Sequence, residues 1–306
     1  MAFTVTQANF NGKAAGFYLS AALKEAKSLE YLTVLENIKY KENIQKMAGT
    51  NLVADNTCGF AVRGGSSLAL TEAVLEPKSL QINLDICKNT LLTSWNALEM
   101  RAGRDAGAPV SFEDYVISYM GEIIADATET SIWGGVTGNN GEFNGFTGYH
   151  LLPGTDATVV QSAAGGAYTA TNIVTELQRL VTDILGGTAA DVLGKDDAYI
   201  YMNRKTFQFY IQKMSTDGYL NAYNMQGDYA PLFEGVKIAV CPGMVDNQMV
   251  FGQKSNLFFG TDLLSDSTRI AIMDMAALDG SDNLRLVARY TAGVTQGVGA
   301  DVVRQS

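Results

Sequence analysis

A long amphipathic helix that runs into a glycine-rich segment is the feature that most constrains the fold of this chain. Residues 111–148 read SFEDYVISYMGEIIADATETSIWGGVTGNNGEFNGFTG. Ser111 is a suitable N-cap, Asp114 follows three residues later, and apolar residues then recur at helical spacing. A helix over residues 111–133 would be about 33 Å long. We expect it to end at Gly134–Gly135 through a residue in the left-handed conformation.

The glycines beside this helix allow two interpretations, a phosphate cradle or a structural turn. A cradle places its glycines at a helix N-terminus, where free N–H groups and the helix dipole meet the anion. Here the glycines follow the C-terminus instead, and no lysine or arginine occurs between Arg104 and Arg179. The structural interpretation is therefore favoured.

Composition indicates a globular chain without a membrane segment. The 306 residues are 47% hydrophobic and 18% charged, which suits one large or two modest domains. No apolar run approaches a membrane span, and the N-terminus lacks a clear signal-peptide pattern, so we expect folding in a cytoplasm. Three scattered cysteines, Cys58, Cys87 and Cys241, are typical of buried thiols rather than of a disulfide framework.

Charge is unevenly spread along the chain, which has a net charge of −10. Residues 1–50 hold six lysines and four glutamates, whereas the remainder holds 16 basic and 28 acidic residues. Nucleic-acid binding draws much of its affinity from phosphate neutralisation. An acidic body therefore disfavours broad binding of nucleic acid.

The hydrophobic periodicity predicts an α+β chain with an N-terminal arm. The arm is expected to carry a helix from about Ser20 to Glu36. We expect further helices over 173–185 and 203–214, strand alternation at 38–45, 68–74 and 80–86, short strands at 198–202, 235–241, 248–252 and 256–260, and two long final strands at 269–275 and 283–290 joined by a turn at 278–283.

The alternating segments before residue 87 predict a long two-stranded excursion. Residues 48–67 are rich in Gly, Asn, Ser and Thr and read as its loop or tip, and Glu76–Pro77 forces an extended joint. A lone hairpin of this kind is marginal in water. It needs a surface to lie on, and a neighbouring subunit is the natural candidate.

A search for catalytic and metal-binding residues finds little. His150 is the only histidine and reads as an ordinary surface residue. Cys58 or Cys241 with His150 would be the residues of a thiol dyad, but no local signature supports one, and inert buried thiols are favoured. There is no Cys-x-x-Cys and no second histidine for a metal site.

Two acidic segments have simple structural interpretations. Residues Asp279 to Asn283 lack the ligand spacing of a calcium loop and read as a hairpin turn. Asp196–Asp197 precedes a strand and is expected to face solvent. The sequence therefore predicts no catalytic, cofactor-binding or metal-binding residues.

The order of these elements resembles that of tailed-bacteriophage major capsid proteins, which have the Hong Kong 97-type fold. One stretch, VLEPKSLQINLDICKNTLLTSW (Val74–Trp95), looks like the return strand of the family's E-loop entering the peripheral domain. A second is the spine helix with its glycine-rich exit. The third is AYIYMNRKTFQFYIQKM, then DGYL, PLFEGVKIAVCPGM and NQMVFGQKSNLFFGTDLL, which in the family form the axial domain.

The resemblance implies an α+β capsid fold with four regions. These are an N-terminal arm (1–36), an extended E-loop hairpin (37–77), a peripheral domain with a long spine helix (78–140 and 266–306), and an axial α/β domain (141–265). Two departures from some relatives matter. A 36-residue arm leaves no room for a scaffolding segment within it, so a separate protein or an already removed propeptide would have to supply scaffolding. The absence of lysine between Met47 and Pro77 argues against a covalent E-loop link.

The implied function is that of a major capsid protein, not an enzyme. Such a chain self-assembles into hexamers and pentamers of an icosahedral shell around packaged double-stranded DNA, with little specific contact to that DNA. Portal and a separate scaffolding or decoration protein are the implied partners, the shell is part of the virion, and assembly occurs in the bacterial host's cytoplasm. The alternatives are an encapsulin-type compartment shell and a thiol hydrolase that uses Cys241 or Cys58 with His150.

Overall fold

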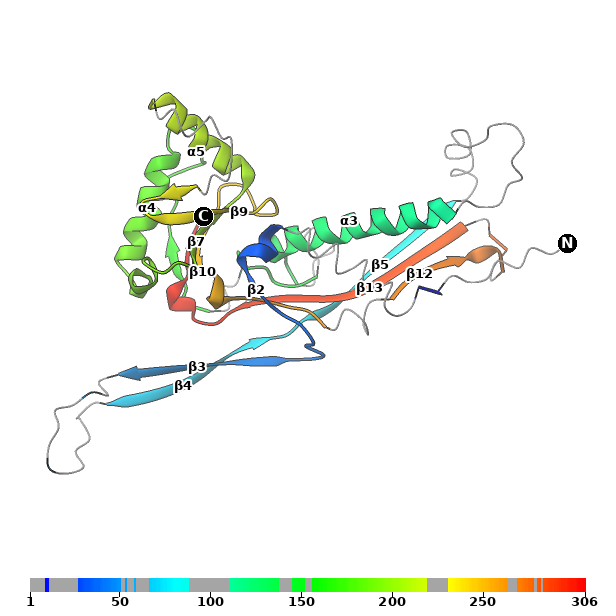
Figure 1. Cartoon of the computed structure of the whole chain (residues 1–306), viewed down its shortest axis with the longest axis horizontal. Helices are drawn as coiled ribbons and strands as arrows, with labels where there is room; N and C mark the ends of the chain where they lie inside the picture. The colour runs from blue at the N-terminus through cyan, green and yellow to red at the C-terminus, as the bar shows by residue number, and fades with distance from the viewer. Residues whose placement is uncertain are drawn as a thin grey trace.

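The computed structural model describes residues 9–10, 27–50, 53, 58, 66–87, 110–137, 145–151, 156–218, 231–262, 269–277, 280–281 and 283–306. The molecule is elongated (Figure 1). A compact α/β part lies at one end, and an extension built from one long helix and long strands leads away from it. A two-stranded hairpin projects from their junction.

The extension is a sheet with a helix lying along it. Helix α3 (Val110–Gly134) runs beside β13 (Asn283–Gln296), the longest strand. Antiparallel neighbours β12 (Arg269–Asp274) and β5 (Lys78–Cys87) pair with the first part of β13. Its second part pairs with β11 (Leu257–Gly260). Outer strands complete this sheet: β2 (Thr33–Leu35) pairs with β11, and β1 (Asn9–Phe10) pairs with β12.

The compact part holds a second six-stranded sheet. Its strands, in spatial order, are β6 (Val160–Ser162), β14 (Val303–Gln305), β10 (Met249–Gln253), β7 (Ala198–Met202), β9 (Val236–Val240) and β8 (Leu232–Phe233). Helices α4 (Ile173–Leu185) and α5 (Arg204–Thr216) pack on this sheet. Short 3₁₀ turns occupy Lys27–Tyr31 (η1), Thr188–Val192 (η3), Lys254–Asn256 (η5), Met275–Ala277 (η6) and Gly299–Asp301 (η7).

Strand β7 separates two hydrophobic cores. Ile200 and Met202 point to the core beneath α4 and α5, whereas Tyr201 points to the core that also contains the end of α3. This follows from the alternation of side chains along a strand. Trp133 from α3 packs against Tyr201, with ring centroids 5.2 Å apart, so the helix end is embedded in the junction of the two parts.

Several elements form where the sequence predicts them. Helices α3 and α4 and strands β4 (Ser67–Leu75), β5 and β7 match their predicted ranges to within a residue or two. Asn203 caps α5 as expected, because its side chain accepts a hydrogen bond from the Thr206 N–H at 2.6 Å. The fold is thus of the α+β class that the periodicity indicates.

Other predictions near the N-terminus are wrong. The helix expected to reach Glu36 is replaced, in the residues described, by the short turn η1 and by strand β2. Pairing with β11 overrides helical propensity there, since Thr33 and Val34 are β-branched and suit a strand. Strand β3 begins only at Glu42, four residues later than the alternation at Ile38 suggests.

Three further boundaries differ from expectation. Ser111 lies inside the first turn of α3 and is therefore not its N-cap. Neither Gly134 nor Gly135 has a positive φ, so α3 does not end through a left-handed residue. Strand β13 continues six residues beyond the predicted end at Tyr290, because β11 offers its second part a partner.

Candidate assembly surfaces

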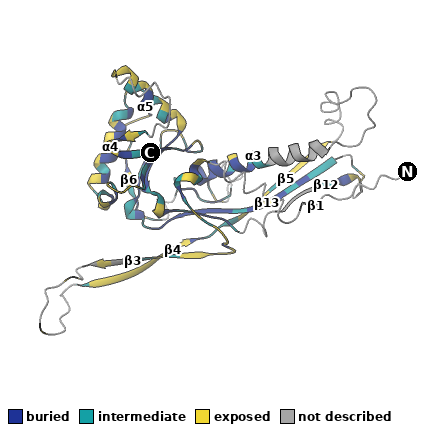
Figure 2. Cartoon of the chain, in the orientation of Figure 1, coloured by how far each residue is buried: buried dark blue, intermediate teal, exposed yellow. Residues whose placement is uncertain are grey.

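One face of the β3–β4 hairpin is an exposed apolar stripe. Strand β3 (Glu42–Thr50) pairs with β4 in a register that places Met47 directly opposite Leu70. Leu68 and Val74 lie on the same side, because side chains alternate along a strand. The four residues are 69%, 62%, 61% and 43% exposed, respectively, and are called the apolar stripe below. Figure 2 shows the hairpin as the most continuously exposed part of the chain.

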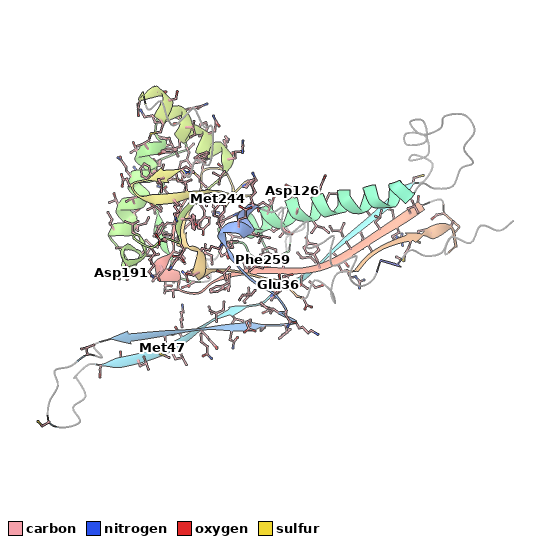
Figure 3. The ribbon with its side chains drawn as sticks, viewed as in Figure 1. Glu36, Met47, Asp126, Asp191, Met244 and Phe259 are labelled. Atoms are coloured by element: carbon pink, nitrogen blue, oxygen red, sulfur yellow. The ribbon has the colours of Figure 1, made fainter. Side chains whose placement is uncertain are left out.

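The other face of the hairpin looks toward the body of the molecule. Ile44 and Lys46 are half-buried there. Burial raises the pKa of Asp156, but hydrogen bonds from Thr158 and Gln296 and the nearby charge of Lys46 lower it below its usual value. Since Lys46 faces the body, the apolar stripe on the opposite face points away from it. Met47 in Figure 3 lies on the hairpin, outside the packed body.

The root of the hairpin crosses over two glycines on neighbouring strands. Gly260 of β11 and Gly293 of β13 are direct register partners. A Cβ atom at Gly293 would lie 2.9 Å from the Pro77 Cα and 3.0 Å from the Glu76 carbonyl oxygen. At Gly260 it would lie 2.8 Å from a Leu75 methyl carbon. The pair of glycines therefore forms the platform on which the hairpin root rests, and this platform sets the hairpin's direction.

Charged side chains tie the two strand ends together at this root. Glu76 accepts from Lys78 at 2.5 Å and Lys41 at 3.1 Å. Hydrogen bonds from Lys78 and then Lys41 hold the pKa of Glu76 below its usual value. All three side chains are substantially exposed, so salt screens these pairs.

The glycine-rich exit of α3 packs closely rather than binding an anion. The last helical carbonyls accept hydrogen bonds from a returning segment, Tyr149 N–H to Ile132 O and His150 N–H to Trp133 O, each at 2.9 Å. Gly148 permits this approach, because a Cβ there would lie 2.6 Å from the Ser131 oxygen. These bonds satisfy orphan carbonyls of the helix end. The structural interpretation of these glycines holds for the residues described; residues 138–144 lie outside them.

A buried carboxylate joins three segments of the chain. Glu129 of α3 is 6% exposed and accepts from the Ser28 hydroxyl at 2.5 Å and the Ser28 N–H at 3.0 Å. It also accepts from the Gly243 N–H at 3.3 Å, and Trp133 donates its indole N–H to the Ser28 oxygen at 2.7 Å. Glu129 therefore fixes η1 and the loop after β9 to the spine helix.

His150 is not the ordinary surface residue that the sequence suggests. It is half-buried, and its Nε2 atom lies 2.8 Å from Gln248 Nε2 and 3.0 Å from Arg304 Nη2. Guanidinium only donates, so Nε2 is the acceptor and the ring proton resides on Nδ1. Burial, and then the charge of Arg304, lower the pKa of His150 to about 4. With its basic nitrogen occupied, His150 is poorly suited to act as a general base.

The three thiols differ in environment. Cys241 is buried, as expected, and burial raises the pKa of its thiol far above the usual range. A thiolate is the reactive form, so this cysteine is inert. Cys58 and Cys87 are exposed, which corrects the expectation that all three are buried. Within the described parts of the chain, the His150 side chain contacts Gln248 and Arg304 rather than a cysteine, which does not support a thiol dyad.

Of the two acidic segments, Asp196–Asp197 is described by the structure, whereas Asp279 lies outside the described residues. Gly280, in the turn after β12, has a φ of +74°, and β12 and β13 pair as an antiparallel hairpin. Asp196 is exposed as predicted, whereas Asp197 is half-buried and accepts from the Gln253 side chain at 2.8 Å. Among the described residues, no group of three or more His, Cys, Asp or Glu side chains is arranged to hold a metal. None of the described helices is long and apolar enough to cross a membrane.

The residues that organise these surfaces were missed in the sequence, although two left signals. Glu129 occupies an apolar-face position of α3, four residues from both Ala125 and Trp133, which is unusual for a charged residue unless it is bonded. Gly260 and Gly293 lie inside strands, where glycine marks close approach of another backbone. Arg304 left no signal, because its surroundings come from distant segments.

Comparison with known structures identifies the fold. No family model and no curated protein matches the chain. Among solved structures, a chain of the capsid of the empty GTA particle matches with a TM-score of 0.59 at 13% identity, covering 92% of this chain and 89% of that chain. A chain of the satellite phage P4 procapsid matches with a TM-score of 0.54 at 13% identity, covering 95% and 98%. A chain of a virus-like particle from Pyrococcus furiosus matches with a TM-score of 0.53 at 9% identity, covering 96% and 99%.

These matches span nearly the whole of both chains. The fold is that of phage capsid proteins, as the resemblance in the sequence predicts. At identities of 9–13%, these matches show the fold alone.

Proposed function

We propose that this chain is a major capsid protein that assembles with copies of itself into a closed shell around packaged double-stranded DNA. The observation that carries the proposal is the exposed apolar stripe on a hairpin that projects from the body. Exposed apolar side chains gathered on one face mark an interaction site, and on this face Glu72 and Gln45 separate Val74 from Met47, Leu68 and Leu70. A two-stranded sheet is marginal by itself, so a neighbouring subunit covering the stripe would stabilise it.

The capsid fold and the charge of the chain support the same proposal. The structural matches include chains from capsid particles, and they cover 92% and 95% of this chain. A net charge of −10 suits a wall that encloses DNA without binding it tightly. The described surfaces are organised by packing and by buried hydrogen bonds, and their histidine and buried cysteine are held in unreactive forms, which supports a structural rather than an enzymatic role.

The finer features of the assembly belong to the same proposal. The capsomers would be hexamers and pentamers of an icosahedral virion shell, assembled in the bacterial host's cytoplasm with portal and a separate scaffolding or decoration protein. The proposed regions are the N-terminal arm (1–36), the E-loop hairpin (37–77), the peripheral domain (78–140 and 266–306) and the axial domain (141–265). Because β14 (Val303–Gln305) pairs with β10, we propose that these last residues belong to the axial domain rather than to the peripheral domain.

A second candidate is the shell of an encapsulin-type compartment. The match to a virus-like particle from Pyrococcus furiosus over 96% of the chain favours keeping it. The two candidates differ in what the shell encloses, DNA or a cargo enzyme. Nuclease-resistant DNA in particles purified from the native source would support the virion shell, and a protein cargo in their place would support the compartment.

Self-assembly is tested on the purified chain. Size-exclusion chromatography with light scattering, followed by negative-stain imaging, should show rings, shells or other large oligomers. A stable monomer across salt and protein concentrations would contradict the proposal. A thiol-reactivity and hydrolase assay of the same sample, with His150→Ala as the comparison, tests the enzymatic alternative, and we expect no activity that depends on His150.

A further inference from the structure

Arg304 is a half-buried guanidinium that has no carboxylate partner among the residues that the structure describes. It lies in β14, where Val303 and Gln305 on either side point to the opposite face and are fully buried. Within the described part of the chain, its side chain donates one hydrogen bond, from Nη2 to His150 Nε2 at 3.0 Å. Of the other arginines described, Arg179 pairs with Glu176 and Arg285 pairs with Asp85.

Neighbouring groups do not neutralise this charge. His150 is neutral and serves only as an acceptor at Nε2, which it shares between Arg304 and Gln248. Two donors of the group, Arg304 Nε and His150 Nδ1, are enclosed in the chain and have no hydrogen-bond partner. Arg304, His150 and Gln248 are called the Arg304 cluster below.

The position of the cluster leaves one side open. On one flank, Arg304 is opposite the buried Val250 of β10. On the other flank it is opposite Gln161 of β6, the outermost strand of the sheet, and Gln161 is exposed. The guanidinium therefore lies where the buried face of the sheet meets solvent. A partly desolvated cation at such a position is costly unless an anion reaches it.

We propose that the Arg304 cluster binds a carboxylate from a neighbouring copy of this chain. Planar guanidinium recognises carboxylate by paired hydrogen bonds, and such bonds are stronger than neutral ones. A second copy is a suitable source, because the chain carries 32 acidic against 22 basic residues. The inference rests on the proposed self-assembly and adds a specific polar contact, distinct from the apolar stripe.

Two variants separate this role from a purely structural one. In the isolated chain Arg304 has no acidic partner, so Arg304→Gln should leave the thermal midpoint unchanged or raise it. In assembly it should raise the protein concentration at which oligomers dissociate by roughly tenfold or more, because a carboxylate of the neighbour loses its cation. Arg285→Gln is the matched control: it removes an exposed arginine that already has its carboxylate within the chain. It should leave the dissociation concentration within about twofold.

The measurements are mass photometry across a dilution series for oligomers and differential scanning calorimetry for the dissociated chain. Unchanged assembly of Arg304→Gln would overturn the inference, and so would a lowered thermal midpoint that accounts for weaker assembly. If the wild-type chain itself never assembles, the proposed function fails and this inference fails with it. Normal assembly of the wild type with normal assembly of Arg304→Gln removes only this inference.

A cryo-EM reconstruction of the assembled particle supplies the direct test. We expect a glutamate or aspartate oxygen of an adjacent copy within about 3 Å of the Arg304 guanidinium. A DNA phosphate, a different protein or solvent alone at that position would overturn the inference.

Discussion

At the scale of single residues, the core beneath the spine helix tolerates a charge only where hydrogen bonds satisfy it, as they do at Glu129. Ile124 is 1% exposed and shares its core with Leu286 and Ala288 of β13, as expected of one of the two mid-helix isoleucines. Ile124→Asp would bury a carboxylate without a partner and leave a cavity, at a cost of about 4 kcal/mol or more. That is a large share of a domain's stability of about 5–15 kcal/mol. We expect no soluble particles from this variant, as judged by sedimentation of lysates.

Its matched control is an exposed residue two positions away. Asp126→Ala changes a solvent-facing side chain of the same helix and should yield normal particles. Ile123, which is only half-buried, should respond less strongly to Asp than Ile124 does. Normal particles from Ile124→Asp would show that the helix is wrongly placed.

His150 gives the chain a predictable sensitivity to acid. Its pKa is lowered to about 4 by burial and by Arg304, against 6.5 in the absence of these effects. The unfolded chain therefore binds the proton more readily, and the free energy of unfolding falls as the pH drops from about 6.5 to about 4. Discounted for the exposed half of the ring, the loss is on the order of 1–2 kcal/mol.

Urea unfolding of the dissociated chain at pH 7 and pH 4.5 measures this effect. His150→Gln removes the titrating group. The free energy of unfolding of the wild type minus that of the variant should therefore be smaller at pH 4.5 than at pH 7 by about 1–2 kcal/mol. An equal difference at both pH values would mean that His150 is not held neutral by its surroundings.

Single residues also show where sequence reasoning stops. The burial of Ile124 follows from helical spacing, and Asn203 from its capping position. Glu129 and Arg304 owe their roles to Ser28, Gly243 and His150, which are distant in the chain. Periodicity reports which face a residue occupies and says nothing about the partner that tertiary packing brings to it.

At the scale of elements, the hairpin stripe separates assembly from folding. Met47 and Leu70 are register partners and are both more than 60% exposed. Replacing both by serine removes little buried area from the single chain, so we expect its unfolding free energy to change by less than about 0.5 kcal/mol. The proposed neighbour, however, would lose an apolar contact. Light scattering should therefore show loss of oligomers from a chain with unchanged circular dichroism.

An exposed threonine on the opposite face provides the control for this pair. Thr71→Ala alters the same strand without touching the apolar stripe and should assemble normally. Equal assembly of the double serine variant and the wild type would place the interface elsewhere.

The glycine platform makes a second prediction for the hairpin. Gly293→Ala places a methyl group against the backbone of Pro77 and Glu76, which cannot move aside as a side-chain end does. We expect the hairpin root to shift and assembly to be lost, with helix content retained. Gly186→Ala is the control, because its Cβ meets only ordinary contacts at 3.5 Å or more. Particles of normal geometry from Gly293→Ala, seen by negative stain, would contradict this account.

Elements with strong local signals were predictable, and those defined by pairing were not. The α3 and α4 helices carry apolar residues at helical spacing, and β4 and β5 alternate clearly. Strand β2, in contrast, exists because β11 lies beside it, and the extension of β13 has the same origin. A three-residue strand has no period of its own to detect.

At the scale of the whole molecule, the arrangement suits a subunit of a larger assembly better than an isolated globular protein. The extension formed by α3 and its sheet, the compact part and the hairpin point in different directions (Figure 1). This shape leaves much surface for contact with neighbouring subunits. This architecture was predicted from the resemblance of the element order to that of phage capsid proteins, and the sequence did not show which strands share a sheet. The angle of the hairpin was not predicted, since it depends on the contact of Gly260 and Gly293 with the hairpin root.

The positions of lysine and cysteine in the chain predict how the proposed shell is held together. No lysine occurs between Met47 and Pro77, so residues 48–76, which include β4, lack the nucleophile for an amide cross-link, and Lys46 of β3 faces the body. Cys58 and Cys87 are exposed, but a disulfide needs two sulfurs at bonding geometry, and the cytoplasm in which we propose that assembly occurs is reducing. Particles alkylated at purification and boiled in detergent without reductant should therefore run as one band near 32.8 kDa. A ladder that persists with reductant would reveal an amide-type link, a ladder removed by reductant would reveal a disulfide through an exposed cysteine, and either would contradict a shell held by non-covalent contacts alone.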